Sequence, residues 1–194
     1  MKSSGSITEI RRSLPGDEPE LKRLWQAVFG DTDEFIDTFF NILYAPGTAC
    51  LALSEGRVIS AGYCLPGVTA GGKTCAYIYA VATYPEYRGL GAARRIVRKI
   101  RDLSFAEGTD VIATLPASEA LTGWYERVLG MEPVFKKGRP GAAFPETWHR
   151  FADAVGAVPG GGTESGSPDR LWAVGAPGVD LHDLKGVGWA FTFE

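Results

Sequence analysis

Residues 48–83 contain three apolar stretches separated by two short polar turns, and this segment limits the possible fold most strongly. The turns fall at Glu55-Gly56 and Gly71-Gly72, where glycine tolerates the positive φ that a tight hairpin requires. The three stretches are therefore predicted to form consecutive antiparallel strands. The last of them, Thr74–Thr83, is rich in aromatic and small apolar residues, which predicts a buried strand.

A short strand over residues 7–14 and two helices are predicted before this meander. The helices cover residues 16–30 and 31–44, where apolar side chains recur at helical spacing. The second helix has Asp31 or Thr32 as its N-cap.

Helices and strands are predicted to alternate after the meander. They are a helix from about Gly91 to Ala106, a strand over 110–115, a helix over 118–130 and a strand over 131–135. Glycine and proline are dense from about 136 to 170, which predicts an insertion or mobile loop within a single domain of residues 1–194. A short helix around Trp148 and Phe151 is expected inside this segment, with closing strands near 170–175 and 186–194.

The stretch "YPEYRGLGAARR", residues 84–95, joins the last strand of the meander to a helix. A helix N-terminus presents unpaired N–H groups and the positive end of its dipole. Glycine and alanine leave that end uncovered, at Gly89, Gly91, Ala92 and Ala93. The order predicts a phosphate or pyrophosphate site, and the alternative is a tight turn whose small residues serve packing alone.

The common phosphate-binding motifs match this loop incompletely. A P-loop needs Lys-Ser/Thr after its last glycine, and none is present. A dinucleotide fingerprint begins at Gly89 and Gly91, but Arg94 stands where its third glycine should be.

Two motifs in the chain resemble the GNAT superfamily of N-acetyltransferases. "AVATYPEYRGLGAA" fits its R/Q-x-x-G-x-G/A signature as Arg88, Gly91 and Ala93, and "SEALTGWYERVLGMEPV" is similar to its later segment. The resemblance covers roughly residues 7–135. It implies an α+β acyl-CoA acyltransferase fold, in which helices flank a mixed, mostly antiparallel twisted sheet and strands four and five splay apart.

The resemblance implies acetyl-coenzyme A as cosubstrate. Its pyrophosphate would bind the loop amides, and its pantetheine arm would lie along the preceding strand, where the N–H near Val81 would stabilise the oxyanion. The residues implied are Arg88, Gly89, Leu90, Gly91, Ala92 and Ala93 for the pyrophosphate, and Val81, Ala82 and Thr83 for the arm. The exposed face of Arg94, Arg95, Arg98 and Lys99 either meets phosphates or is merely solvated.

Tyr125 matches the position of the family's usual general acid. A phenol with a pKa of about 10 can protonate a thiolate as it leaves. The alternative is a core role, since Tyr125 shares a helical stripe with Leu121, Val128 and Leu129. Ser118 matches a position that contacts the cofactor and is often Asn, and its alternative role is to cap the helix.

The chain departs from the family at the fourth strand, which carries no carboxylate to act as base for the incoming amine. "CAYIYAVAT" offers Tyr77 and Tyr79 instead. The remaining candidates are a water chain or a carboxylate at Glu34, Asp37 or Glu194.

Composition adds limits on partners and location. A net charge of -3 argues against nucleic acid and permits cationic substrates. The three cysteines show no CxxC spacing, which predicts reduced thiols and a cytoplasmic location. The two histidines lie far apart and near no cysteine, so no metal site is expected. No apolar stretch is long enough to span a bilayer or resembles a signal peptide, so no membrane role is expected.

Three functions are compatible with these features. The leading one is acetyl-CoA-dependent N-acetyltransfer, by direct attack, to the primary amine of a small molecule or peptide. A non-catalytic acyl-CoA sensor or scaffold and an unrelated nucleotide-binding module are the alternatives. A homodimer is left open.

Overall fold

The computed structural model describes residues 6–157 and 168–193. The chain divides into two compact units, Met1–Leu65 with Ile78–Ile100 and Pro66–Tyr77 with Arg101–Glu194. The expected single domain stays a prediction, and each unit is described by itself. Residues 158–167 of the insertion or mobile loop predicted at about 136–170 lie outside the described residues.

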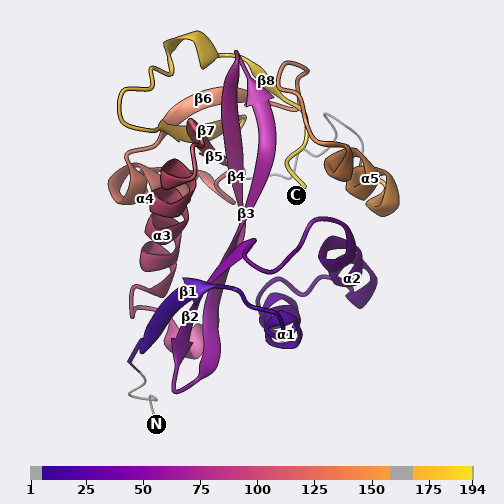
Figure 1. Cartoon of the computed structure of the whole chain (residues 1–194), viewed down its shortest axis with the longest axis vertical. Helices are drawn as coiled ribbons and strands as arrows, with labels where there is room; N and C mark the ends of the chain where they lie inside the picture. The colour runs from indigo at the N-terminus through magenta and orange to yellow at the C-terminus, as the bar shows by residue number, and fades with distance from the viewer. Residues whose placement is uncertain (1–5, 158–167, 194) are drawn as a thin grey trace. The chain divides into compact units, whose positions relative to one another are not determined.

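The described elements follow the predicted order closely (Figure 1). The strands are β1 (Glu9–Arg12), β2 (Ala49–Ser54), β3 (Arg57–Ala70), β4 (Lys73–Thr83), β5 (Val111–Thr114), β6 (Glu132–Lys137), β7 (Arg170–Gly175) and β8 (Gly188–Trp189). The helices are α1 (Glu18–Phe29), α2 (Asp33–Ile42), α3 (Ala92–Ala106), α4 (Glu119–Leu129) and α5 (Glu146–Val155), with 3-10 turns η1 (Pro85–Tyr87) and η2 (His182–Leu184).

The strands are hydrogen-bonded in the order β1-β2-β3-β4-β5-β7-β6-β8. β1 with β2, β2 with β3, β5 with β7 and β6 with β7 are antiparallel, whereas β4 with β5 and β6 with β8 are parallel. The predicted mixed, mostly antiparallel sheet is confirmed. The β4–β5 ladder covers Cys75–Tyr77 opposite Val111–Ala113, and β4 then continues to Thr83.

In the first unit, α1 and α2 cover one face of the strands and the N-terminal part of α3 covers the other (Figure 1). Trp25 and Phe39 pack on Tyr63 of β3, with ring centroids 5.2 and 5.1 Å away. On the opposite face Gly62 admits α3 closely, because a Cβ at that position would lie 3.2 Å from Cγ2 of Ile96.

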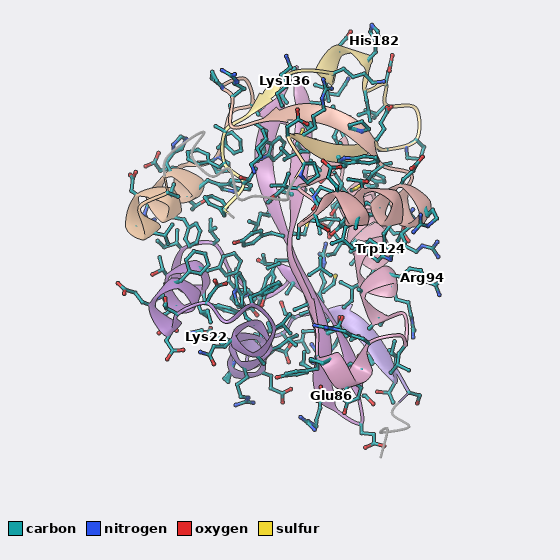
Figure 2. The ribbon with its side chains drawn as sticks, turned by 180° about the vertical axis from the view of Figure 1, so that it is seen from behind. Lys22, Glu86, Arg94, Trp124, Lys136 and His182 are labelled. Atoms are coloured by element: carbon teal, nitrogen blue, oxygen red, sulfur yellow. The ribbon has the colours of Figure 1, made fainter. Side chains whose placement is uncertain are left out.

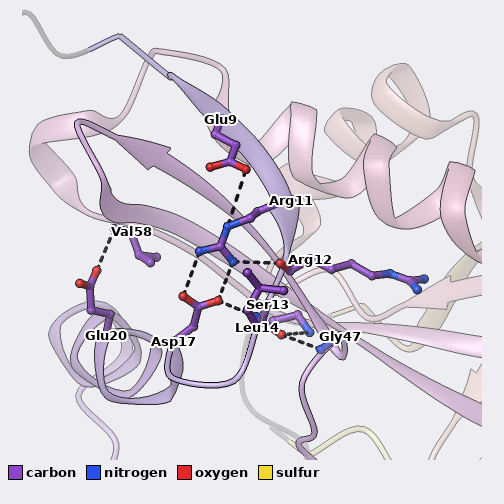
Figure 3. A network of polar contacts seen from close by, with 10 residues as sticks. Glu9, Arg11, Arg12, Ser13, Leu14, Asp17, Glu20, Gly47 and Val58 are labelled. Atoms are coloured by element: carbon purple, nitrogen blue, oxygen red, sulfur yellow. Dashed lines mark hydrogen bonds and ion pairs between the residues drawn. The ribbon is translucent and has the colours of Figure 1, made fainter.

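Polar contacts fix the start of α1 to the sheet (Figure 3). Arg11 donates two hydrogen bonds to the Asp17 carboxylate, at 2.6 and 3.0 Å, and the Leu14 N–H donates a third at 2.6 Å. These bonds hold the pKa of Asp17 below its usual value. From the helix itself, Glu20 accepts a hydrogen bond from the Val58 N–H of β3 at 2.9 Å. Hydrogen bonds therefore join the first turn of α1 to both β1 and β3.

The second unit has its own aromatic core. It is built from the rings of Tyr77, Phe135, Phe144, Trp148, Trp189, Phe191 and Phe193. The Tyr77 hydroxyl donates to the carbonyl of Thr192 at 3.1 Å, so the C-terminal segment lies against β4. The predicted closing strand near 186–194 is wrong for most of its described length, because within the described residues only Gly188–Trp189 pairs as β8. The carbonyls of Phe191 and Thr192 accept hydrogen bonds from side chains, those of Trp189 and Tyr77, instead of from a neighbouring strand.

Candidate active site

The loop from Arg88 to Ala93 combines two left-handed residues with the start of a helix. Gly89 and Gly91 have φ values of +87° and +77°, which favour glycine strongly over other residues. The turn before them is anchored by Tyr87, which is buried. Arg88 is exposed, and its Nε lies 3.4 Å from the carbonyl of Thr83, at the end of β4. The chain therefore leaves the strand through a turn whose shape requires both glycines.

The N–H groups of this loop are available to a ligand. The first hydrogen bond of α3 runs from the Arg95 N–H to the Gly91 carbonyl at 3.1 Å, so the N–H groups of residues 92–94 have no acceptor within the helix. Within the described residues, the N–H groups of Gly89, Leu90 and Gly91 donate no hydrogen bond either. A Cβ at Gly89 would meet no atom within 4 Å. Open backbone with unpaired donors at a helix N-terminus is the geometry that binds phosphate.

Positive charge borders the loop. The side chains of Arg94, Arg95, Arg98 and Lys99 are exposed on α3, as predicted. Figure 2 shows Arg94 on the outer side of the helix, and a Cβ at Gly91 would lie 3.5 Å from its Nη2 atom. On the inner side of α3, Ala92 is buried and Ala93 only half-buried. The helix dipole and these side chains both favour an anion at this end of α3.

β4 changes course just before the loop, at Ala80, for which the sequence predicts no special conformation. Ala80 has a φ of +49°, as at the left-handed residue of a β-bulge. The ring of Tyr79 packs on Trp25, on the α1 and α2 side, with centroids 5.8 Å apart. The Val81 side chain lies on the α3 side, since a Cβ at Gly62 would be 3.3 Å from its Cγ2. In a regular strand, residues two positions apart lie on the same face of the sheet. Tyr79 and Val81 lie on opposite faces, so the positive φ at Ala80 has reversed the alternation of side chains.

The end of β4 is held in place by Ser60 of β3. Its hydroxyl lies 2.7 Å from the Ala82 carbonyl and 2.7 Å from the Thr83 hydroxyl. Ala82 is buried, whereas Val81 and Thr83 are half-buried. The structure thus places the three predicted arm-binding residues together on a firmly held strand end, directly before the loop. No signal in the strand sequence distinguishes Ala80, because Ala76 and Ala82 also stand between larger residues.

Tyr125 belongs to the second unit, on α4. Its side chain is 7% exposed and its ring packs edge-on against Trp124, with centroids 4.8 Å apart. Burial raises the pKa of Tyr125, and a hydrogen bond with Thr114 of β5 partly opposes this. The phenol is therefore protonated at neutral pH. The predicted core stripe is wrong for Leu121, which is 40% exposed, whereas Val128 and Leu129 are buried.

Ser118 occupies the N-cap position of α4, as predicted, but its side chain makes no capping bond. The predicted capping role of its hydroxyl is therefore wrong. In α2, by contrast, Thr32 accepts a hydrogen bond from the Phe35 N–H at 3.2 Å and caps the helix as expected.

The proposed bases differ in their surroundings. Asp37 is exposed and forms an ion pair with Lys22 at 2.8 Å, and Glu34 is exposed. Burial is the main cause that raises the pKa of Tyr79, so its phenol stays protonated at neutral pH and has no tyrosinate form to take up a proton. Glu194 lies outside the described residues. The described part of the chain brings together no group of three or more His, Cys, Asp or Glu side chains fit for a metal ion.

The fold and the loop define the class: a mixed-sheet protein in which a glycine-containing turn with unpaired N–H groups joins β4 to α3. A family model described as "Acetyltransferase (GNAT) domain" matches residues 9–128, more than half of the chain. The chain belongs to this acetyltransferase family.

Solved structures share the fold at low sequence identity. A GNAT family N-acetyltransferase (YhbS) from Escherichia coli in complex with CoA is 18% identical, with a TM-score of 0.65 and coverage of 97% of this chain and 93% of that one. A GCN5-related N-acetyltransferase from Anabaena variabilis is 20% identical, with a TM-score of 0.57 over 66% of this chain and 32% of its own. N-acetylglutamate synthase from Neisseria gonorrhoeae, complexed with coenzyme A and N-acetyl-glutamate, is 16% identical, with a TM-score of 0.56 over 90% of this chain and 35% of its own.

The matched region spans about a third of the Anabaena structure's length. No curated protein sequence matches the chain. Among the helices of the described residues, none is long and apolar enough to cross a membrane.

Proposed function

We propose that the protein is an acetyl-CoA-dependent N-acetyltransferase that transfers acetyl directly to the primary amine of a small molecule or peptide. The observation that carries this proposal is the row of unpaired N–H groups from Gly89 to Arg94, at the place where the family's signature lies. Solved structures of the same fold contain coenzyme A.

The loop amides would hold the pyrophosphate, assisted by the dipole of α3. The strand end from Val81 to Thr83 would pair with the pantetheine arm as an added strand, and Ser118 would contact the cofactor through the hydroxyl that leaves its helix uncapped. The N–H of Val81, next to the reversal at Ala80, would stabilise negative charge on the thioester oxygen.

Tyr125 would supply the proton that the reaction needs at sulfur. The amine nitrogen bonds to the carbonyl carbon, the C–S bond breaks, and the phenol protonates the departing thiolate. The nitrogen loses a proton to solvent as the amide forms, and a proton from solvent restores the phenol. Burial favours this role, since the raised pKa of Tyr125 keeps its phenol protonated in the working pH range.

Thermal stabilisation by acetyl-CoA, ATP and NAD tests the proposed ligand. Stabilisation by acetyl-CoA alone is expected, and stabilisation by ATP or NAD alone would favour a nucleotide-binding module. Thiol release with a panel of primary amines then tests turnover. Binding without thiol release from any amine would favour a sensor or scaffold.

Tyr125→Phe tests the acid. It keeps the ring contact with Trp124 and removes the hydroxyl, so acetyl-CoA should still bind while kcat falls roughly 10²- to 10⁴-fold. Tyr63→Phe, at another buried tyrosine, is the matched control and should keep its kcat. Full activity in Tyr125→Phe would show that the acid assignment is wrong.

A further inference from the structure

The structure holds a carboxylate beside β4, although the strand itself carries none. Asp31 lies in the connection between α1 and α2, directly after Gly30, whose φ of +74° ends α1. The indole Nε1 of Trp25 donates a hydrogen bond to Oδ2 of Asp31 at 2.7 Å. The Trp25 side chain is itself 2% exposed, so the bond fixes the carboxylate against a rigid ring in the core of the first unit.

The same tryptophan connects Asp31 to the reversal in β4. Its ring meets Tyr79 edge-on at 5.8 Å between centroids, and Tyr79 directly precedes Ala80. The charge of Asp31 is felt at this strand, since it contributes to the raised pKa of the Tyr79 hydroxyl. Asp31, Trp25, Tyr79 and Ala80 all belong to the first unit. A negative charge therefore acts at Tyr79, two residues before the strand segment proposed to hold the thioester.

Asp31 differs from the other carboxylates of α2 and the preceding connection. Its oxygen is held by an indole and, within the described residues, by no Lys or Arg. Asp37 is neutralised by Lys22, which also pairs with Glu18 at 2.7 Å. Asp33 and Glu34 are exposed in the first turn of α2, whereas Asp31 is half-buried. Asp31 is thus the carboxylate of this region that is both sheltered and without a cationic partner.

We propose that Asp31 binds the ammonium group of the acceptor and accepts its proton. The inference rests on the proposed N-acetyltransfer and identifies the acceptor as an amine that is protonated in solution. R–NH3⁺ gives one proton to the carboxylate and becomes R–NH2, whose lone pair forms the C–N bond as the C–S bond breaks. The proton then passes to solvent. An acceptor amine with a pKa near 10 is protonated at neutral pH, so it must lose a proton before it can attack the thioester.

Asp31→Asn is the informative variant, because an amide oxygen still accepts the Trp25 hydrogen bond while the charge is lost. Asp33→Asn is its matched control, with the same change at an exposed residue in the first turn of α2. Each is assayed for thermal stabilisation by acetyl-CoA, and for kcat and KM with two acceptors: an alkylamine, charged at pH 7, and an aromatic amine, uncharged at pH 7.

Asp31→Asn should keep its stabilisation by acetyl-CoA and lose roughly 10²-fold or more in kcat/KM with the alkylamine, with little loss on the aromatic amine. Asp31→Glu should recover part of the loss, and Asp33→Asn should match the wild type. Undiminished activity of Asp31→Asn on the alkylamine, or equal losses on both amines, would overturn the inference while leaving the proposed function intact. A wild type that releases no thiol with any amine would instead overturn the proposed function.

Discussion

Gly91→Glu tests the phosphate loop most directly, because its effect on the fold can be separated from its effect on binding. Gly91 has a φ of +77°, so any side chain there adopts a left-handed conformation at a cost of roughly 1–2 kcal/mol. A Cβ at this position would lie 3.5 Å from Nη2 of Arg94, an ordinary van der Waals distance. The folded state should therefore survive, with a modest loss of stability.

The loss in ligand binding should be much larger. The glutamate would place a carboxylate among the N–H groups that are proposed to receive the pyrophosphate. Hydrogen bonds to charged groups contribute about 1.5–3 kcal/mol each, so losing two would cost about 3–6 kcal/mol. That corresponds to roughly a 10²- to 10⁴-fold weaker Kd for coenzyme A. Charge repulsion between the carboxylate and the phosphates acts in the same direction.

Gly130→Glu is the matched control for this variant. Gly130 has a φ of +72°, ends α4 and would place its Cβ within 4 Å of no atom. The two variants carry the same strain and the same change of charge. Calorimetric titration with coenzyme A and chemical denaturation should show similar stabilities for both and weakened binding for Gly91→Glu alone. Equal affinities in the two variants would refute the assignment of the loop as the phosphate site.

Two further predictions concern the first unit. Gly62→Val should lower the free energy of unfolding by about 1–3 kcal/mol in chemical denaturation, because its side chain would meet Ile96 and Val81 at 3.2 and 3.3 Å; an unchanged value would show that α3 packs less closely on β3. Asp17→Asn should cost about 1–2 kcal/mol at pH 7, since the charge that Arg11 stabilises is lost. The folded pKa of Asp17 is lowered, so its stabilisation is present above the usual value of 3.8 and is lost as the pH falls through the folded pKa. The stability difference between wild type and variant should therefore shrink in acid, and a difference independent of pH would contradict this origin.

Local chemistry explains why so much of the fold could be predicted. The hairpin turn glycines Gly56, Gly71 and Gly72 all have positive φ, as the turn pattern requires. Thr32 caps α2, and Gly30 and Gly130 end α1 and α4 in left-handed conformations. Each of these features depends on neighbouring residues in the chain, so periodicity and turn chemistry predict it.

The open backbone of the loop between β4 and α3 could also be predicted, because it too depends on neighbouring residues. Gly89, Gly91 and Ala92 lie within four residues, and the unpaired N–H groups of a helix N-terminus exist wherever a helix begins. Neighbouring residues did not predict that the Ser118 hydroxyl makes no capping hydrogen bond, because its rotamer depends on surroundings beyond the helix.

The tertiary structure alone decided two features of the candidate site. Ala80 reverses β4 although alanine has no local preference for positive φ, so contacts from both faces must impose that conformation. Asp31 is one of four acidic residues between positions 31 and 37, and nothing in their spacing distinguishes it. The Trp25 indole that binds Asp31 lies only six residues earlier in the chain, but its own position depends on packing against Tyr63 and Tyr79, which are distant in the chain.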